Sequence, residues 1–500
     1  MLNYAFLEIL ESLTRDEIKS FRRFILSPYF NRSQKVLRLF DCIIKYYPNF
    51  DNPKLSKEVL HKKISPDLPY NELTMRRLLF DLQNLAEKFM RQIYIEKKEP
   101  ESKLMAIEEL AIRGASRMHK LITRDTEVLL DNEIVDAEQC LNHFKLETEK
   151  FYFGMINDKI TRKNFIDTEA GKLIKGITYF ISYFMLESIK HNETLLNYSL
   201  SFKVKHSYKF ISQFLELFDL ERLEIFMTKH SLAGSYIIKA YLNMLKAFLY
   251  FDNDYYYEEF KSSVFDNLEK FSNTDKNFLF AKLSAYCTIK GFDNSVTNKN
   301  YDNELFGIYR ILVENKYYET EANKYMPVDL YRNILFQASR MKELRWLEEF
   351  IEDYSRLIHP NRKTDIINYS YAFLNFERGN FGDSLKWLSK IRMEEFSYHL
   401  DIRNMYLRIY YEQGDYESAL SSSKAFLKYL NENTIISDDK KQANENLVKF
   451  TIKLINYHNT SSKTDPTSLM LQANKCKRLS SKEWLLTKVH ELDRSVKKAI

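Results

Sequence analysis

The sequence offers few groupings of residues that could carry out chemistry. The segment Gly171-Lys-Leu-Ile-Lys-Gly176 comes nearest to a phosphate-binding loop, but no Lys-Ser or Lys-Thr pair follows its last glycine. A phosphate-binding loop needs that lysine for the phosphates and that hydroxyl for the magnesium ion. We therefore interpret the segment as part of a helix surface.

Metal-binding residue types are also poorly grouped. The ten histidines include no HExxH sequence and no pair four residues apart, which is the spacing that lets one helix hold zinc. A group of carboxylates resembles a cation-binding loop but lacks the glycine and the ligand spacing of an EF-hand. It consists of Asp252, Asp254, Glu258 and Glu259. We expect a solvated turn there, and we assign no catalytic residue, no metal and no cofactor.

Cysteine usage and the distribution of apolar residues bear on the compartment. Four cysteines lie far apart without a CxxC pair, which predicts buried free thiols in a reducing compartment. They are Cys42, Cys140, Cys287 and Cys476. The most apolar run, Ile177 to Leu186, has ten residues, whereas a membrane span needs about 20. The N-terminal stretch contains Glu8 and Glu11 and indicates an amphipathic helix rather than a signal peptide. We expect a soluble, cytoplasmic protein.

Composition indicates which elements carry these residues. The chain has only 10 glycines and 9 prolines in 500 residues, far below the usual ~7% and ~5%. A β-sandwich, or an enzyme with glycine-rich βα turns, needs more turn-forming residues than this. Hydrophobic residues make up 45% of the chain, which excludes a disordered protein. The composition therefore predicts an all-α fold, with most of the aromatic residues packed between helices.

Residues 1–100 are predicted to form an N-terminal helical domain. Thr14 and Glu17 have the spacing of a capping box, and the helix they begin must end near Ser27-Pro28. We expect Asn31 to cap the next helix and Asn71 to begin a long one with an apolar stripe. Six of the nine prolines fall between Pro28 and Pro100, which favours a boundary near residue 100.

The sequence of residues 101–320 predicts a run of helical hairpins whose ends are only weakly marked by turn-forming residues. We expect helices over Leu104–Ile122 and Thr126–Ile160, and an aromatic-rich helical stretch over Leu173–Ile189. A turn is expected at Phe251–Asp254.

Residues 321–500 contain the clearest internal repeat. Two segments align at an offset of 35 residues, and each has a helix followed by Gly-Asn-Phe or Gly-Asp-Tyr and a second helix. Gly379 and Gly414 supply left-handed helix ends, and Asn380 and Asp415 begin the next helices. A final helix, with an apolar stripe that starts at Leu485, is expected to close the array.

These hairpins resemble the tetratricopeptide (TPR) family, whose repeat is about 34 residues long. The resemblance implies a right-handed α-solenoid in which the first helices of the hairpins line a concave groove. In that family the groove residues bind protein or peptide partners. Carried onto this chain, the candidate contacts are Tyr369, Phe373, Phe376, Asn404, Arg408 and Tyr411. The same side chains could instead pack between hairpins.

A second resemblance concerns the N-terminal domain. Phe24-Ile-Leu-Ser-Pro-Tyr-Phe-Asn31, Tyr47-Pro48 and Pro69-Tyr-Asn71 resemble a module at the head of an uncharacterised family of bacterial helical proteins. This resemblance implies the domain division and no function.

Two functions remain open from sequence, and an enzyme is the least favoured class. The first is a non-catalytic scaffold that binds a protein or peptide in the groove. The alternative is a nucleic-acid-associated regulatory protein, because residues 1–100 and 470–500 each carry a net charge of +5 within a total of +6. Arg22-Arg23, Arg76-Arg77 and Lys62-Lys63 could contact phosphates, as could Lys475, Lys477 and Arg478.

Overall fold

The fold is all-α, as the composition predicts. The computed structural model describes residues 5–131, 134–157, 165–201, 213, 219–230, 232, 234–292, 300–320, 323–392, 396–460 and 466–499. Across these residues the chain forms 23 α-helices and no strand. None of the described helices combines the length and the apolar character that a membrane crossing requires.

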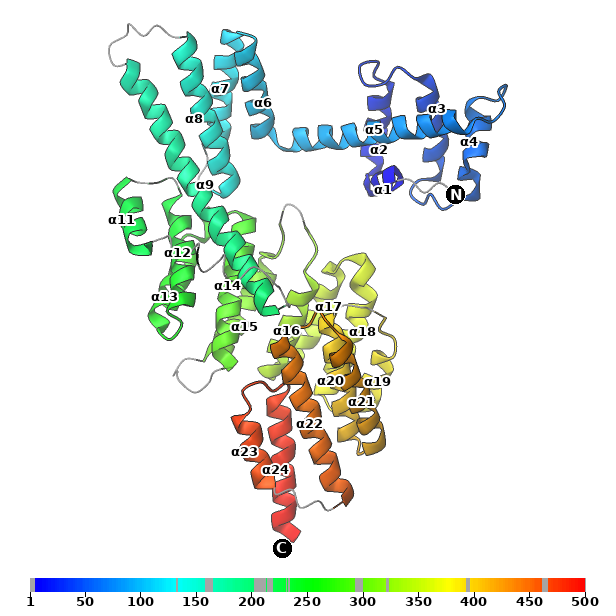
Figure 1. The fold of residues 1–500 in the computed structure, drawn as a ribbon, viewed down its shortest axis with the longest axis vertical. Coiled ribbons are helices and arrows are strands. Elements are labelled where there is room, and N and C mark those ends of the chain that lie inside the picture. Colours follow the sequence, from blue (N-terminus) through cyan, green and yellow to red (C-terminus); the bar gives the residue numbers. More distant parts are fainter. Residues whose placement is uncertain are drawn as a thin grey trace. The chain divides into compact units, whose positions relative to one another are not determined.

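The chain divides into two compact units (Figure 1). Unit 1 comprises residues 1–131 and 142–176, and unit 2 comprises residues 132–141 and 177–500. The sequence predicts boundaries at residues 100 and 320 from the turn-forming residues between helices, whereas the two units reflect which residues pack together. The predicted boundaries stay a prediction.

Unit 1 begins with five helices around one apolar core. They are α1 Ala5–Ser12, α2 Arg15–Leu26, α3 Gln34–Ile43, α4 Lys57–Ile64 and α5 Glu72–Lys97. The Thr14–Glu17 capping box and the Asn71 cap are confirmed, since both side chains accept backbone hydrogen bonds at the expected helix starts. The Asn31 prediction is wrong, because Ser33 caps α3 while Asn31 bonds to the loop backbone.

The remaining helices of unit 1 differ from the sequence prediction. They are α6 Glu99–Ile112, α7 Ser116–Leu130, α8 Ala137–Asn157 and α9 Phe165–Ser201. The first residues of α8 and the larger part of α9 belong to unit 2. A continuous helix over Leu104–Ile122 is wrong because Gly114, with φ of +66°, ends α6 in a left-handed turn. The predicted helix over Thr126–Ile160 is also wrong, since α7 ends at Leu130.

Unit 2 is a series of helices that pack as consecutive hairpins. Its helices are α11 Leu220–His230, α12 Ser235–Leu249, α13 Asp254–Phe265, α14 Asn273–Phe292, α15 Tyr301–Glu314, α16 Val328–Arg340, α17 Leu344–Tyr354, α18 Pro360–Glu377, α19 Phe381–Leu388, α20 Phe396–Glu412, α21 Tyr416–Glu432, α22 Asp438–Thr460, α23 Pro466–Lys475 and α24 Lys482–Ala499. Within each hairpin the two helices pack together, as α12 does with α13 and α18 with α19. First helices also contact one another, in the pairs α12–α14, α16–α18, α18–α20 and α20–α22.

The hairpin turns follow the sequence prediction closely. Gly379 and Gly414 have φ of +77° and +72° and stand between α18 and α19 and between α20 and α21. The equivalent turn between α16 and α17 uses Lys342 instead, with φ of +60°, and Lys316, with φ of +54°, follows the end of α15. Local left-handed geometry therefore ends these helices with or without glycine.

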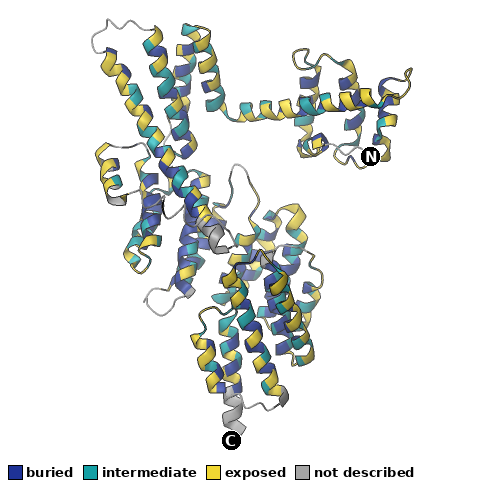
Figure 2. Cartoon of the chain, in the orientation of Figure 1, coloured by how far each residue is buried: buried dark blue, intermediate teal, exposed yellow. Residues whose placement is uncertain are grey.

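The hairpins are held together by large buried side chains, many of them tyrosines and phenylalanines. In Figure 2 the buried residues, in dark blue, recur along the helices of unit 2. A continuous apolar cluster extends from α9 to α20, and a second one joins α20–α24. Many of the aromatic residues pack inside, as expected from composition, whereas others, such as Phe80 and Tyr94, are exposed. All four cysteines are free, but only Cys140 and Cys287 are buried, whereas Cys42 and Cys476 are half-buried.

Candidate functional site

The six groove residues predicted from sequence lie together on two neighbouring first helices. Tyr369, Phe373 and Phe376 are on α18, and Asn404, Arg408 and Tyr411 are on α20. Five of them are buried, and Arg408 is half-buried. Each of the two helices is covered by a different part of the chain.

The α18 residue Tyr369 lies beneath an ion pair that joins α16 to α20. Arg332 donates through Nε and Nη2 to both carboxylate oxygens of Asp401, with Nη2–Oδ1 at 2.6 Å. The Tyr369 hydroxyl donates to Asp401 Oδ2 at 3.1 Å, and its side chain is fully buried. Burial and the Asp401 carboxylate raise the pKa of Tyr369 well above its ordinary value. The tyrosine is therefore a neutral donor that helps to satisfy Asp401.

The α20 residues lie beneath the C-terminal helix α24 and the turn before it. Asn404 donates to the hydroxyls of Ser480 and Ser481 at 3.2 and 3.0 Å. The ring of Trp484 meets Tyr411 edge-on with centroids 5.5 Å apart, and its Nε1 donates to Glu412 Oε1 at 2.6 Å. The sequence predicts that a final helix closes the array, and this helix is α24. It contacts the side of α20 that carries the candidate groove residues, and it also packs against α22 and α23.

Arg408 is enclosed by aromatic rings. Its guanidinium carbon lies 4.4 Å from the ring centroid of Phe376 and 5.3 Å from that of Trp484. Its Nε has no hydrogen-bond partner in the structure, and burial lowers the pKa of the guanidinium to about 10. Glu377 and Glu412 stabilise the charge from nearby. Arg408 is therefore a cation packed against aromatic rings in this structure.

The same face is covered at the other end of the array by the C-terminal half of α9. Glu193 of α9 forms a buried ion pair with Lys282 of α14 at 2.8 Å. Lys190 contacts Asp275 at 2.7 Å, and this carboxylate also accepts the hydroxyl hydrogen bond of Tyr241 at 2.8 Å. Charges buried in this way are paired, as the low dielectric requires.

The chain itself therefore covers one side of its first helices, which we call the first-helix face. The C-terminal half of α9 covers α12 and α14, the ion pair between α16 and α20 covers α18, and α24 with the turn before it covers α20. The six predicted contacts face other parts of the protein in this conformation, and their role in partner binding stays a prediction. The packing alternative agrees with their position. Sequence reasoning missed the covering by α9, although the charged residues Lys190 and Glu193 beside its aromatic stretch were a visible signal.

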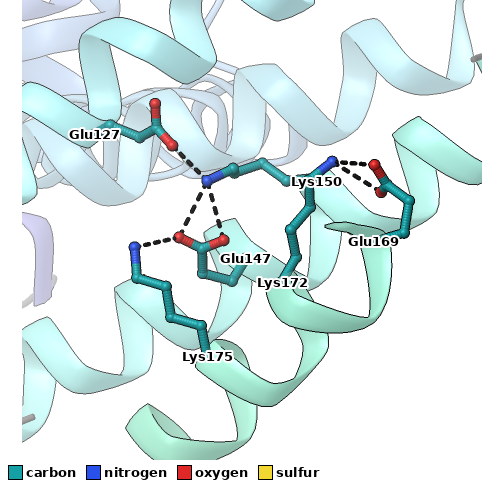
Figure 3. A network of polar contacts seen from close by, with 6 residues as sticks. All are labelled: Glu127, Glu147, Lys150, Glu169, Lys172 and Lys175. Carbon is teal, nitrogen blue, oxygen red and sulfur yellow. Dashed lines mark hydrogen bonds and ion pairs between the residues drawn. The ribbon is translucent and has the colours of Figure 1, made fainter. Parts of the chain in front are cut away.

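Unit 1 contains a network of three glutamates and three lysines on α7, α8 and α9 (Figure 3). Glu147, which is buried, accepts from Lys175 at 2.8 Å and from Lys150 at 3.0 Å, and Lys150 also contacts Glu127. Burial raises the pKa of Glu147, but the hydrogen bonds from Lys175 and Lys150 outweigh it and lower the pKa. A carboxylate held ionised in this way is suited to joining helices rather than to exchanging protons.

Glu169 completes the network from α9. It accepts from Lys172 at 2.6 and 2.8 Å and lies against Gly154 of α8, where a Cβ would overlap its carboxylate. A side chain at residue 154 would therefore force the Glu169 carboxylate to move from its present position.

The other chemical candidates from sequence lie on ordinary helical positions. Gly171 and Gly176 are inside α9, so their segment is not a loop. Asp254, at the start of α13, pairs with Lys290 at 3.0 Å. Among the residues that the structure describes, no three His, Cys, Asp or Glu side chains are grouped to hold a metal ion.

An exposed apolar stripe lies on α7, on the side opposite its buried residues. Met118, Leu121 and Val128 are exposed by 50%, 44% and 72%. They are spaced by three and seven residues. In two heptads that start at Met118, Met118 takes the first a position, and Leu121 and Val128 take the two d positions. The half-buried Asp125 takes the second a position.

Two cations lie beside this stripe. Arg117 and Arg124 take the g positions that come directly before Met118 and Asp125, and both are exposed. The next g position, at the end of α7, holds Asp131. Neither arginine forms an ion pair with any residue that the structure describes. Apolar a and d positions flanked by charge are how one helix presents itself to another.

Two basic residues near the C-terminus bond within the chain, and one of them, Arg478, is among the predicted phosphate contacts. Arg478 bonds to Asp439 at 2.8 Å and to Gln442 at 2.8 Å. Lys482 donates to the carbonyl of Asn474 at 3.0 Å.

Comparison with protein-family models, with curated proteins and with solved structures gives no significant match for this chain.

Proposed function

We propose that the chain is a non-catalytic protein-interaction scaffold in which TPR-like hairpins form a right-handed solenoid and α7 presents the docking surface. The consecutive hairpins of unit 2, with contacts between their first helices, support the solenoid. The first-helix face is occupied by the chain, so the proposed docking surface lies elsewhere than in the TPR family.

The exposed stripe of α7 carries this proposal. A helix that exposes apolar residues at heptad spacing is suited to pack against a second helix. With Met118, Leu121 and Val128 outside, α7 leaves apolar surface in water that a partner would bury.

The flanking charges define the chemistry of the partner. Arg117 and Arg124 at successive g positions favour a helix with Asp or Glu at the facing positions, because opposite charges there set partner choice. We therefore propose an amphipathic helix of another protein, with an apolar stripe and acidic flanks, as the occupant.

Affinity purification of the full chain from its host tests the proposal, with direct binding of each recovered partner to the purified protein as the required second step. Leu121→Asp with Val128→Asp should abolish recovery, and Arg117→Glu with Arg124→Glu should weaken it at least tenfold. Leu73→Asp is the matched control, because Leu73 is 76% exposed near the start of α5 in the same unit. Unchanged recovery by the α7 variants would refute the proposal, as would a dimer of this chain that the Leu121 and Val128 changes dissolve.

A further inference from the structure

The loop between α2 and α3 displays one aromatic ring to solvent. Tyr29 is 88% exposed, the largest exposure among the large apolar and aromatic residues described. Its ring meets that of Phe30 edge-on, with centroids 5.0 Å apart. Phe30 in turn stacks on the buried Phe24 at 3.9 Å. The exposed ring therefore rests on aromatic side chains anchored in the core.

The backbone of this loop is tied down by hydrogen bonds. The amides of Phe30 and Asn31 donate to the carbonyl of Ser27 at 3.1 and 2.9 Å. The Asn31 side chain donates to the carbonyls of Ile25 and Ser33 at 3.0 and 3.1 Å and accepts from the Ser33 amide at 2.9 Å. Tyr29 thus projects from a preorganised loop, which reduces the entropy that a ligand contact would cost.

Cations are frequent along the two helices that flank this loop and in the turn after α3. Residues 15–45 hold 8 Lys and Arg against 3 Asp and Glu, a net charge of +5 that equals the whole excess of residues 1–100. All eight basic side chains are exposed. We call them, with Tyr29, the α2–α3 surface: Arg15, Lys19, Arg22, Arg23, Arg32, Lys35, Arg38 and Lys45.

The acids of this segment are already engaged. Asp16 pairs with Lys19 at 2.8 Å, and Glu17 belongs to the capping box. Asp41 of α3 accepts two hydrogen bonds from Arg22 of α2, at 2.8 and 3.0 Å. This pair places the exposed faces of the two helices side by side.

Six cations of the α2–α3 surface therefore remain without an acidic partner among the described residues. They are Arg15, Arg23, Arg32, Lys35, Arg38 and Lys45. Lys35 and Arg38 are three residues apart on α3, so they lie on the same side of that helix.

We propose that the α2–α3 surface binds single-stranded nucleic acid, with the unpaired cations on consecutive phosphates and a base stacked on Tyr29. Single-strand binding combines a basic track for the backbone with aromatic rings for unstacked bases. A duplex keeps its base faces covered, so it would leave the exposed ring unused. An anionic membrane would need a broader apolar face than one ring and its neighbours.

Fluorescence anisotropy of the full chain with labelled oligo(dT) and oligo(U) of about 12 nucleotides tests this proposal. We expect binding at about 50 mM salt. As the salt concentration rises, the logarithm of the association constant should fall linearly with the logarithm of the salt concentration. Tyr29→Ala should weaken binding roughly tenfold and leave the salt slope unchanged, while Tyr29→Trp should restore it. Arg32→Glu with Arg38→Glu should weaken binding and also reduce the salt slope.

Controls separate this site from general basicity. Lys88→Glu reverses one positive charge on an exposed position of α5, outside the α2–α3 surface, and should leave the affinity unchanged within twofold. Circular dichroism of each variant checks folding. Failure to bind either oligonucleotide, equal or tighter binding of a 12-base-pair duplex, or binding only to vesicles of phosphatidylserine would each overturn the proposal. So would full affinity in Tyr29→Ala.

Discussion

Arg332 and Asp401 form a two-bond ion pair across the buried ring of Tyr369, although 69 residues separate them in sequence. The pair joins α16 to α20, while α18 lies between them in the chain and contacts both. A second link runs beside it, where the Tyr398 hydroxyl donates to the Val328 carbonyl at 2.8 Å. Polar contacts of this kind fix how three successive hairpins sit on one another.

We predict that Asp401→Asn destabilises unit 2 by about 2–3 kcal/mol, because it leaves the guanidinium of Arg332 without a counter-charge. Replacing both partners with apolar residues, Arg332→Met with Asp401→Leu, should recover most of that loss. Amide hydrogen exchange of α16 and α20 measures the effect locally. Arg345→Ala, which breaks an exposed pair with Glu349, is the control and should cost less than about 0.5 kcal/mol. An equally small effect of Asp401→Asn would show that the buried pair contributes nothing.

Arg408→Glu is expected to unfold the α18–α24 region rather than to act as a surface change. The new carboxylate would lie between Phe376 and Trp484, near Glu377 and Glu412, without a cation to compensate it. We expect a loss of about 3 kcal/mol or more, compared with about 1 kcal/mol for Arg408→Met, which keeps the packing. Thermal unfolding followed by tryptophan fluorescence reports on this region through Trp484. Similar melting of the two variants would contradict the enclosed position of Arg408.

Gly154→Ala should destabilise unit 1, although the same change inside an exposed helix stabilises by about 1 kcal/mol. The added Cβ would displace the buried Glu169 carboxylate from Lys172. In a Glu169→Ala background the conflict is absent, so Gly154→Ala should become neutral or stabilising. The four proteins form a double-mutant cycle that can be measured by urea unfolding. Additive effects would contradict the contact.

The stability of the Glu147 network should depend on pH in a defined direction. Lys175 and Lys150 hold the pKa of Glu147 below its unfolded value of 4.5, so the network contributes fully above that pH. The contribution is lost as pH falls through the lower folded pKa. We expect Glu147→Gln to be less stable than the wild type at pH 7 and to approach it below pH 4.5. Hydrogen exchange of α8 across this range is the measurement, and a constant difference would contradict the assignment.

The helix ends that sequence predicted correctly depend on interactions between near neighbours. Thr14 and Asn71 cap helices through bonds to amides three residues later, and Gly379 and Gly414 end them with positive φ. Such features are visible in a short window of sequence. Gly114 has the same role but was missed, since the apolar pattern continues across it.

The state of the first-helix face could not be predicted, because contacts between distant segments decide it. Nothing near Asn404 indicates that Ser480 and Ser481 will bond to it, more than 70 residues later. The TPR resemblance concerns the hairpins themselves, and it contains no information on α9 or α24. The candidate contacts lie on the first helices α18 and α20, as the repeat predicts, but the sequence does not show what covers them.

The position of α24 sets a limit on how the protein can be divided for experiments. A fragment that stops before Ser480 would lose the buried side chains of Leu485, Val489 and Leu492 and would expose Tyr411 and the second apolar cluster to water. Such a fragment is expected to aggregate, whatever the quality of its remaining hairpins. Expression of unit 2 should therefore extend at least through Leu492, and proteolytic trimming of the C-terminal helix should be regarded as damage to the core rather than as removal of a tail.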